Sequence, residues 1–411
     1  MQNTPLSNRL HIGIFGRVNV GKSSLINALT DQDTAIVSET PGTTTDPVHK
    51  AMEIHGLGPV VVFDTGGIDD AGALGAMCVD KTFKVLNKTD VSLLVLDKRE
   101  QMGVCEENFL KEVKNRGIPC IAVINKCDVI ESNDELKTLL KSLKLPFVEV
   151  SALKRSGLDA LRDQITQSAP EDFERKIILA DLLRPGDTVV LVAPLDIEAP
   201  KGRLKLPQVQ TIRDVLDAGC QALILKEDIL LSSINDMMVK PRLVIAESQV
   251  LSEVARILPK DIPLTSFSML YARYKGDLEV LARGAKAVDL LNKDSRILIA
   301  EACTHHPVGE DVGRVVIPEL IRKRLGFDEG GLRIDYAAGY QYPDNLQGYD
   351  LVIHCGGCML NRRQMMHRLA SAAGSHVAIT NYGMLIAYCS GILDRSLDAL
   401  GIRQIPAANA A

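Results

Sequence analysis

The chain has 411 residues, a formal net charge of −5, 4% aromatic residues and no tryptophan. This length predicts about two or three domains, and the charge balance argues against a basic surface for nucleic acid or for acidic lipid. No apolar run approaches the ~20 residues that cross a bilayer, and nine scattered cysteines are too sparse for a disulfide scaffold. We therefore expect a cytoplasmic protein without a membrane segment, in which clustered thiols stay reduced and can bind metal.

The first predicted strand, residues 9–15, leads into a phosphate-binding loop. Residues 16–24 match the pattern G-x-x-x-x-G-K-S, and a helix is predicted to follow. In this pattern backbone N–H groups surround the phosphates, Lys22 neutralises the β and γ oxygens, and the Ser23 hydroxyl binds Mg²⁺. The residues expected to contact the nucleotide here are Gly16, Asn19, Val20, Gly21, Lys22, Ser23 and Ser24.

Two further segments are expected to approach the γ-phosphate and its Mg²⁺ ion. The apolar run 60–63 ends in Asp64-Thr65-Gly66-Gly67, where Asp64 would hold Mg²⁺ through water and the Gly67 N–H would contact the γ-phosphate. Residues 39–46 contain three adjacent threonines, of which we expect Thr44 to bind Mg²⁺ in the GTP state. The expected catalytic residues are Asn19, Lys22, Thr44, Asp64 and Gly67.

The base is predicted by the segments that end two later strands. The strand 121–124 leads into Asn125-Lys126-Cys127-Asp128, and the Asp128 carboxylate can accept hydrogen bonds from guanine N1–H and N2–H₂. Adenine lacks this pair of donors and would leave the carboxylate unpaired. Lys126 can cover the base, and the backbone at Ser151 and Ala152, after the strand 147–150, can meet the guanine oxygen.

Residues 9–168 resemble a small GTPase G domain, and the switch segment resembles the TrmE/Era-type branch. The resemblance implies binding of GTP and GDP with Mg²⁺. In the TrmE branch an asparagine of the phosphate loop binds K⁺, and Asn19 stands at that position here. Ile68 replaces the water-orienting glutamine of many signalling GTPases, so the resemblance implies slow, K⁺-stimulated hydrolysis.

A second α/β pattern begins after the charged connector 170–176. Strands are expected near 188–192, 222–225, 243–246 and 264–267, with helices near 208–218, 229–237 and 250–258 between them. This alternation predicts a small parallel layer. It contains no catalytic constellation, which favours a scaffold or an oligomerisation role.

The last third of the chain places soft ligands at the ends of two predicted strands. The strand 296–300 runs into Cys303-Thr304-His305, and the strand 350–353 runs into His354-Cys355-Gly356-Gly357-Cys358. Carboxyl ends of parallel strands share one crevice, so these side chains are expected to converge. Three thiolates suit either a Cys₃His zinc site, completed by His305 or His354, or an iron–sulfur cluster with one iron left to an exchangeable ligand.

The spacing of these cysteines and histidines resembles the [FeFe]-hydrogenase maturation GTPases of the HydF type. The resemblance covers nearly the whole chain and implies a [4Fe–4S] cluster held by Cys303, Cys355 and Cys358. It also implies a homodimer through the middle domain, and a scaffold that takes a di-iron precursor from two radical-SAM maturases to the [FeFe]-hydrogenase apoprotein. His305 and His354 are either cluster ligands or neighbours that orient the ligands. Glu301 and Cys389 are further candidates for the fourth position.

The expected fold is α/β with three domains, each a mainly parallel sheet flanked by helices. They are a P-loop GTPase domain at 1–168, a dimerisation domain at 169–265 and a doubly wound cluster domain at 266–411. The alternative is a TrmE/Era-like RNA-modification or ribosome-assembly GTPase with a structural zinc site. The acidic balance and the scarcity of aromatic residues count against a nucleic-acid partner.

Overall fold

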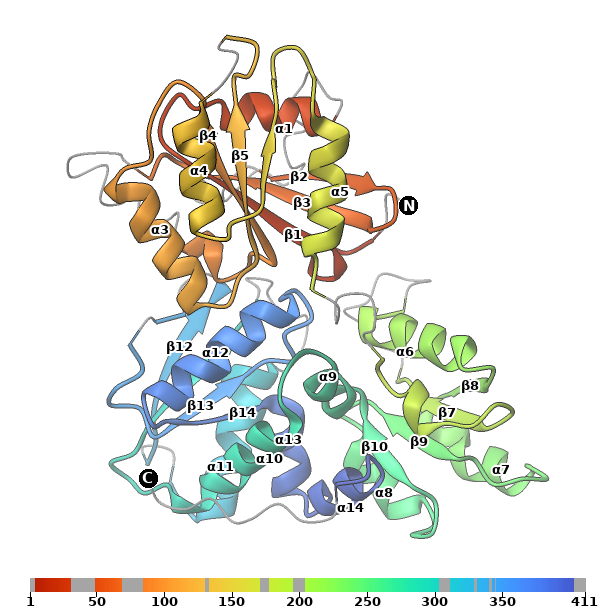
Figure 1. The fold of residues 1–411 in the computed structure, drawn as a ribbon. Coiled ribbons are helices and arrows are strands. Elements are labelled where there is room, and N and C mark those ends of the chain that lie inside the picture. The colour runs from red at the N-terminus through yellow and green to blue at the C-terminus, as the bar shows by residue number, and fades with distance from the viewer. Residues whose placement is uncertain are drawn as a thin grey trace. The chain divides into compact units, whose positions relative to one another are not determined.

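The computed structural model describes residues 4–30, 49–68, 84–129, 133–170, 177–194, 204–302, 311–328, 331–339, 342–343 and 345–402. The chain divides into two compact units, Met1–Arg175 and Lys176–Ala411. Figure 1 shows the elements of both units as sheets covered by helices, which is the predicted α/β class.

The first unit contains a six-stranded sheet in the order β2-β3-β1-β4-β5-β6. All neighbouring strands are parallel except β2, which runs antiparallel to β3 at the sheet edge. The strands are β1 (Leu10–Phe15), β2 (His49–Ile54), β3 (Gly58–Asp64), β4 (Val91–Asp97), β5 (Cys120–Asn125) and β6 (Phe147–Glu149). Strands β1 and β4 are buried throughout and mainly apolar, which is typical of parallel strands covered on both faces.

Helices cover both faces of this sheet, as Figure 1 shows. On one face α1 (Lys22–Thr30) and α5 (Leu158–Ser168) contribute Leu25, Leu161 and Ile165 to the core. On the other face α3 (Val104–Asn115) and α4 (Asp134–Ser142) contribute Phe109 and Leu136. Each helix buries one stripe because its apolar residues recur at helical spacing.

The second unit begins with a four-stranded parallel sheet in the order β10-β9-β7-β8. Its strands are β7 (Thr188–Val192), β8 (Gln221–Leu225), β9 (Leu243–Ala246) and β10 (Leu264–Ser266). Its helices are α6 (Leu206–Asp217), α7 (Leu230–Asn235), α8 (Leu251–Ile257) and α9 (Phe267–Lys275). The predicted parallel layer is therefore present, and α9 is an element that the sequence pattern did not predict.

The other sheet of this unit is also four-stranded and parallel, in the order β12-β11-β13-β14. Its strands are β11 (Arg296–Glu301), β12 (Arg333–Ala338), β13 (Leu351–His354) and β14 (Ala378–Asn381). The helices that follow or precede them are α10 (Leu278–Lys286), α11 (Ile317–Leu325), α12 (Arg362–Gly374), α13 (Tyr382–Cys389) and α14 (Leu393–Asp398). In this register Ala300 pairs with His354, so β11 and β13 end side by side.

One hydrophobic core runs through both sheets of the second unit. It contains Val190 and Ile245 from one sheet, Leu298 and Val352 from the other, and Leu270 of α9 between them. Burial of this continuous core accounts for the compactness of the unit. The expected division into three domains at residues 168 and 265 stays a prediction.

Candidate functional site

The phosphate loop joins β1 to α1 with the backbone shape that its sequence predicts. Gly21 has φ +96°, and a Cβ on it would lie 2.4 Å from Asn125 Nδ2, so the loop requires glycine here. Asn19 has φ +63° and an exposed side chain. Asparagine tolerates this left-handed conformation better than most residues. The loop therefore packs directly against the end of β5.

Lys22 lies over the carbonyl groups of the same loop. Its Nζ donates to Gly16 O at 2.9 Å and to Arg17 O at 2.7 Å, and the side chain is buried. A nucleotide phosphate would offer this ammonium a charged acceptor, and charge-assisted bonds are roughly twice as strong as neutral ones.

The side chains predicted to hold Mg²⁺ face each other. Ser23 Oγ donates to Asp64 Oδ2 at 2.7 Å. Asp64 Oδ1 is buried and has no hydrogen-bond partner among the described residues. A buried carboxylate oxygen without a partner is costly, and a hydroxyl beside a carboxylate is a donor set that suits Mg²⁺. The pair therefore fits the predicted ion, while Thr44 lies outside the described residues.

The segment after β3 lies against the phosphate loop. Ile68 N donates to Gly16 O at 3.2 Å, and Thr65 Oγ1 donates to Ile14 O at 2.6 Å. These two bonds fix both sides of Gly66 and Gly67 next to residues 14–16. Gly67 is thus placed at the loop, as its predicted role requires.

The residues predicted to bind guanine are joined to the phosphate loop. Asn125 Nδ2 donates to Val20 O at 2.9 Å, and Asn125 Oδ1 accepts from Ala152 N at 3.1 Å. Lys126 Nζ donates to Asn19 O at 2.7 Å. Three segments far apart in the sequence therefore meet in one arrangement.

Asp128 is partly exposed and held in its charged form. Ser151 Oγ donates to Asp128 Oδ1 at 2.5 Å, and this bond lowers the pKa of Asp128. A carboxylate that is ionised and positioned can accept the two guanine donors directly.

Asp97, at the end of β4, is a residue of this site that the sequence reasoning missed. Lys126 Nζ donates to its Oδ2 at 2.7 Å, and Arg99 donates to both of its oxygens. Burial acts to raise the pKa of Asp97, but the bonds from Arg99 and Lys126 outweigh it and hold the pKa well below its usual range. Asp97 positions Lys126, and its place at the end of an apolar run was the signal that could have revealed it.

The second group of predicted site residues lies at the carboxyl ends of β11 and β13. Cys355 N donates to Ala300 O at 2.9 Å, and Cys355 Sγ accepts from Ala302 N at 3.1 Å. Burial raises the pKa of this thiol, while the N–H groups of Gly357 and Ala302 act to lower it. N–H groups directed at a cysteine sulfur are a common feature of iron–sulfur sites.

The two glycines between Cys355 and Cys358 differ in role. Gly357 has φ +63°, and a Cβ on it would lie 2.5 Å from Met365 Cε, so this turn requires glycine. A Cβ on Gly356 would meet nothing within 4 Å among the described residues. Gly356 therefore presents an open side of the turn, which a bulky group can approach.

His354 is fully buried, and both of its ring nitrogens have protein partners. Nδ1 lies 2.7 Å from Cys355 O, and Nε2 bonds with Arg368 of α12. Burial, followed by the Arg368 charge, lowers the pKa of His354 to about 3. The neutral ring can donate through Nδ1 and accept through Nε2, which favours the predicted neighbour role over direct ligation.

Cys303 and His305 lie outside the described residues. Among the described residues no group of three or more His, Cys, Asp or Glu side chains is arranged to hold a metal ion. Glu301 Oε1 and the Tyr382 hydroxyl both lie close to Gly313, within 3.1 Å and 2.3 Å of a Cβ built there. Cys389 packs against a hydrophobic core, and burial raises its pKa to about 11, as expected of a structural thiol.

Lys275 contacts the cysteine turn and was not predicted. Its side chain is 2% exposed, and its Nζ donates to Cys358 O at 2.9 Å and to Leu360 O at 2.8 Å. It is the last residue of α9, in a segment with no motif, so no local sequence pattern pointed to it.

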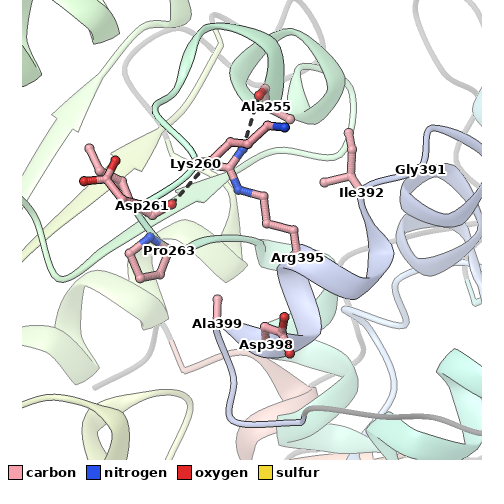
Figure 2. Close-up of a pocket in the computed structure, with 10 residues that line it drawn as sticks. Ala255, Lys260, Asp261, Pro263, Gly391, Ile392, Arg395, Asp398 and Ala399 are labelled. Atoms are coloured by element: carbon pink, nitrogen blue, oxygen red, sulfur yellow. Dashed lines mark hydrogen bonds between the residues drawn. The ribbon is translucent and has the colours of Figure 1, made fainter.

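A pocket of about 620 Å³ lies elsewhere in the second unit and contains none of the predicted site residues. Figure 2 shows Arg395 of α14 reaching across it toward Ala255. The Arg395 guanidinium donates to the carbonyls of Ala255, Leu258, Pro259 and Ile262. Its contacts are with backbone oxygens, so we assign Arg395 a structural role.

Comparison with known proteins identifies the family. Residues 178–276 match the model of the hydrogen maturase F dimerization domain, and residues 279–399 match the hydrogen maturase F tetramerization domain. The chain belongs to the hydrogen maturase F family. Residues 11–126 match the model of the 50S ribosome-binding GTPases, so this hydrogen maturase F protein carries a P-loop GTPase domain.

Curated relatives share only part of their length with this family member. It is 37% identical over 177 residues to GTPase Der of Wolinella succinogenes, covering 41% of this chain and 37% of Der. It is 34% identical over 174 residues to the tRNA modification GTPase MnmE of Thermotoga maritima, covering 41% of this chain and 38% of MnmE. The chain thus spans less than two fifths of the length of either relative.

A solved structure of Era from Aquifex aeolicus, bound to GDP and AlF₄⁻, is also similar. The identity is 23%, the TM-score is 0.34, and the match covers 53% of this chain and 93% of Era. In the part of the chain that the structure describes, no helix has both the length and the apolar character needed to span a membrane.

Proposed function

We propose that this hydrogen maturase F protein is a GTP-hydrolysing scaffold that binds a [4Fe–4S] cluster through Cys303, Cys355 and Cys358. In this proposal it carries a di-iron precursor from two radical-SAM maturases to the [FeFe]-hydrogenase apoprotein. The observation that carries the cluster site is the environment of Cys355. Its half-buried sulfur accepts the Ala302 N–H, on a turn that also holds Cys358.

Chain connectivity supports the third ligand. Cys303 follows Ala302 directly, and consecutive Cα atoms are about 3.8 Å apart. The residue next to a backbone group that contacts Cys355 is therefore itself a cysteine. Three cysteines leave one iron of a four-iron cluster to another ligand, which suits a protein that must bind and release cargo. His305 stays a candidate for that position, and the engagement of both His354 nitrogens favours a positioning role for His354.

The hydrolytic step uses residues that the fold brings together. Lys22 and the loop amides would bind the phosphates, while Ser23 and Asp64 would hold Mg²⁺, which would neutralise charge on the β and γ oxygens. The chain has Ile68 where a water-orienting glutamine would stand, so hydrolysis is expected to be slow. We propose that the nucleotide state controls association with partners, since the cysteines lie outside the GTPase domain.

Self-association follows from the two family domains, and the homodimer is part of the proposal. The edge strand β8 and its neighbouring helices expose apolar side chains, among them Leu216, Ile224, Ile229 and Met238. An exposed strand edge with apolar neighbours is a template for pairing with a second chain. This surface supports a dimer through the domain that the family model names.

Anaerobic purification followed by metal analysis tests the cluster. We expect about four irons and four sulfides per chain, with the broad visible absorption and the reduced-state EPR signal of a [4Fe–4S] cluster. A colourless protein with one zinc and no sulfide would contradict the proposal and favour the alternative GTPase with a structural Cys₃His zinc site.

Potassium is expected to stimulate hydrolysis. Asn19 is an exposed residue of the phosphate loop with a left-handed backbone, and a cation beside the phosphates could use its side-chain oxygen. GTP turnover should be faster in KCl than in NaCl at the same ionic strength, and Asn19→Ala should remove the difference. Equal rates of the wild-type protein in the two salts would exclude a K⁺ site.

Base specificity is expected to depend on Asp128. Asp128→Asn removes a carboxylate that accepts two guanine donors, and hydrogen bonds to a charged group contribute about 1.5–3 kcal/mol each. GTP affinity measured by calorimetry should fall by about 100-fold or more, while affinity for XTP should rise because the new amide can donate to the xanthine oxygen. Asp134→Asn, on the exposed start of α4, is the matched control and should leave both affinities unchanged.

A further inference from the structure

Lys275 is a buried lysine that joins two of the family domains. It is the last residue of α9 and falls within the dimerization-domain match at 178–276. Its ammonium group reaches the turn after β13, which falls within the tetramerization-domain match at 279–399. With 2% of its surface exposed, this side chain is removed from water almost completely.

The three N–H donors of Lys275 all have acceptors in one turn. Nζ lies 2.9 Å from Cys358 O, 2.8 Å from Leu360 O and 3.4 Å from Gly357 O. Burying an ammonium group is costly unless hydrogen bonds replace its water shell. The turn between Cys355 and Asn361 is therefore shaped around this ammonium group.

The orientation of these carbonyls determines the orientation of the neighbouring amides. In a trans peptide the C=O and N–H bonds point in opposite directions. Since Gly357 O and Cys358 O face Lys275, the N–H groups of Cys358 and Met359 point away from it. On the same turn, the N–H of Gly357 approaches Cys355 Sγ.

The helix that carries Lys275 is held at both ends. At its start Ser266 Oγ accepts from Met269 N at 3.3 Å. In the middle of the helix the Tyr271 hydroxyl bonds with Gln210 of α6. At its end Arg362, the first residue of α12, donates to Tyr274 O and Gly276 O at 3.2 Å each. The ammonium group is therefore fixed relative to the turn that it contacts.

We propose that Lys275 is a positioning residue for the cluster site: it holds the turn between Cys355 and Asn361 with the Cys358 and Met359 amides directed away from its ammonium group, and its charge raises the reduction potential of the bound cluster. The proposal rests on the cluster site proposed above. A fixed positive charge in a poorly solvated site favours the state with the extra electron, and N–H bonds to sulfur act in the same direction.

The test compares the reduction potential of variants by EPR-monitored titration of reconstituted protein. Lys275→Met removes the charge and the donors at similar volume, and Lys275→Arg keeps both. Lys323→Met, which changes an exposed lysine of α11, is the matched control. At a fixed potential we expect Lys275→Met to shift the oxidised-to-reduced ratio about tenfold toward oxidised, which is about 59 mV for one electron. Lys275→Arg should restore most of this shift, and Lys323→Met should cause none.

A second measurement uses the protein before cluster loading. The carbonyls of Cys358 and Leu360 lose the ammonium donor in Lys275→Met, so thiol-reactive probes should label Cys358 faster than in the wild type, with Lys323→Met unchanged. If Lys275→Met does not fold, Lys275→Gln, which keeps a donor without the charge, takes its place in both measurements.

The possible outcomes separate this inference from the proposed function. Wild-type protein without iron and sulfide would overturn the cluster site and the inference with it. Wild-type protein with a cluster, and a Lys275→Met variant with the same potential and the same Cys358 reactivity, would overturn the role of Lys275 alone.

Discussion

Replacing Lys22 with alanine is expected to lower kcat/KM for GTP by about 100-fold or more and to leave the iron content unchanged. The ammonium of Lys22 lies at the carbonyls of Gly16 and Arg17, where it can transfer its bonds to the phosphates. Two charge-assisted hydrogen bonds contribute about 3 kcal/mol or more, and each 1.36 kcal/mol is tenfold in rate. Phosphate release under saturating Mg²⁺ measures the effect.

Lys141→Ala is the matched control for Lys22→Ala. Lys141 is exposed on α4, away from the phosphate loop, and its loss should change kcat/KM by less than twofold. Iron and sulfide analysis of both variants checks the independence of the two sites. Loss of iron in Lys22→Ala would show that nucleotide binding and cluster loading depend on each other.

Replacing Cys355 with serine is expected to abolish cluster loading while GTP hydrolysis stays within about twofold of the wild type. Cys355 directly follows β13 and is half-buried, and its sulfur already accepts the Ala302 N–H, so the hydroxyl fits the space. A hydroxyl is a much poorer ligand for iron than a thiolate. Iron, sulfide and visible absorption after anaerobic reconstitution measure the loss.

Cys389→Ser is the control for Cys355→Ser. It changes the last residue of helix α13, a cysteine that packs against a hydrophobic core. We expect it to load a full cluster. Loss of iron in Cys389→Ser would make Cys389 the fourth ligand, and loss of GTPase activity in Cys355→Ser would contradict the separation of the two functions.

The nucleotide site follows from the sequence in unusual detail. Its residues come in short motifs at strand ends, and each motif fixes its own backbone, as Gly21 does by its close approach to Asn125. Parallel strands then bring the motifs to one sheet edge, where Asn125 contacts Val20 and Ala152. Asp97 was missed because it ends its strand without a motif around it.

At the cysteine site the sequence by itself determined the place of the predicted ligands Cys355 and Cys358. Cysteines after two apolar runs must lie at the carboxyl ends of two strands, and in the fold the described cysteines follow β13, the neighbour of β11.

Which groups surround these cysteines was decided only by the tertiary structure. His354 meets Arg368 across 14 residues, and Lys275 meets Cys358 across 83 residues. A contact between distant residues leaves no local pattern in the sequence. The residues on either side of one partner do not depend on the identity of the other partner. Strand ends and motifs are encoded locally, whereas the charge that faces a buried turn depends on how whole helices pack.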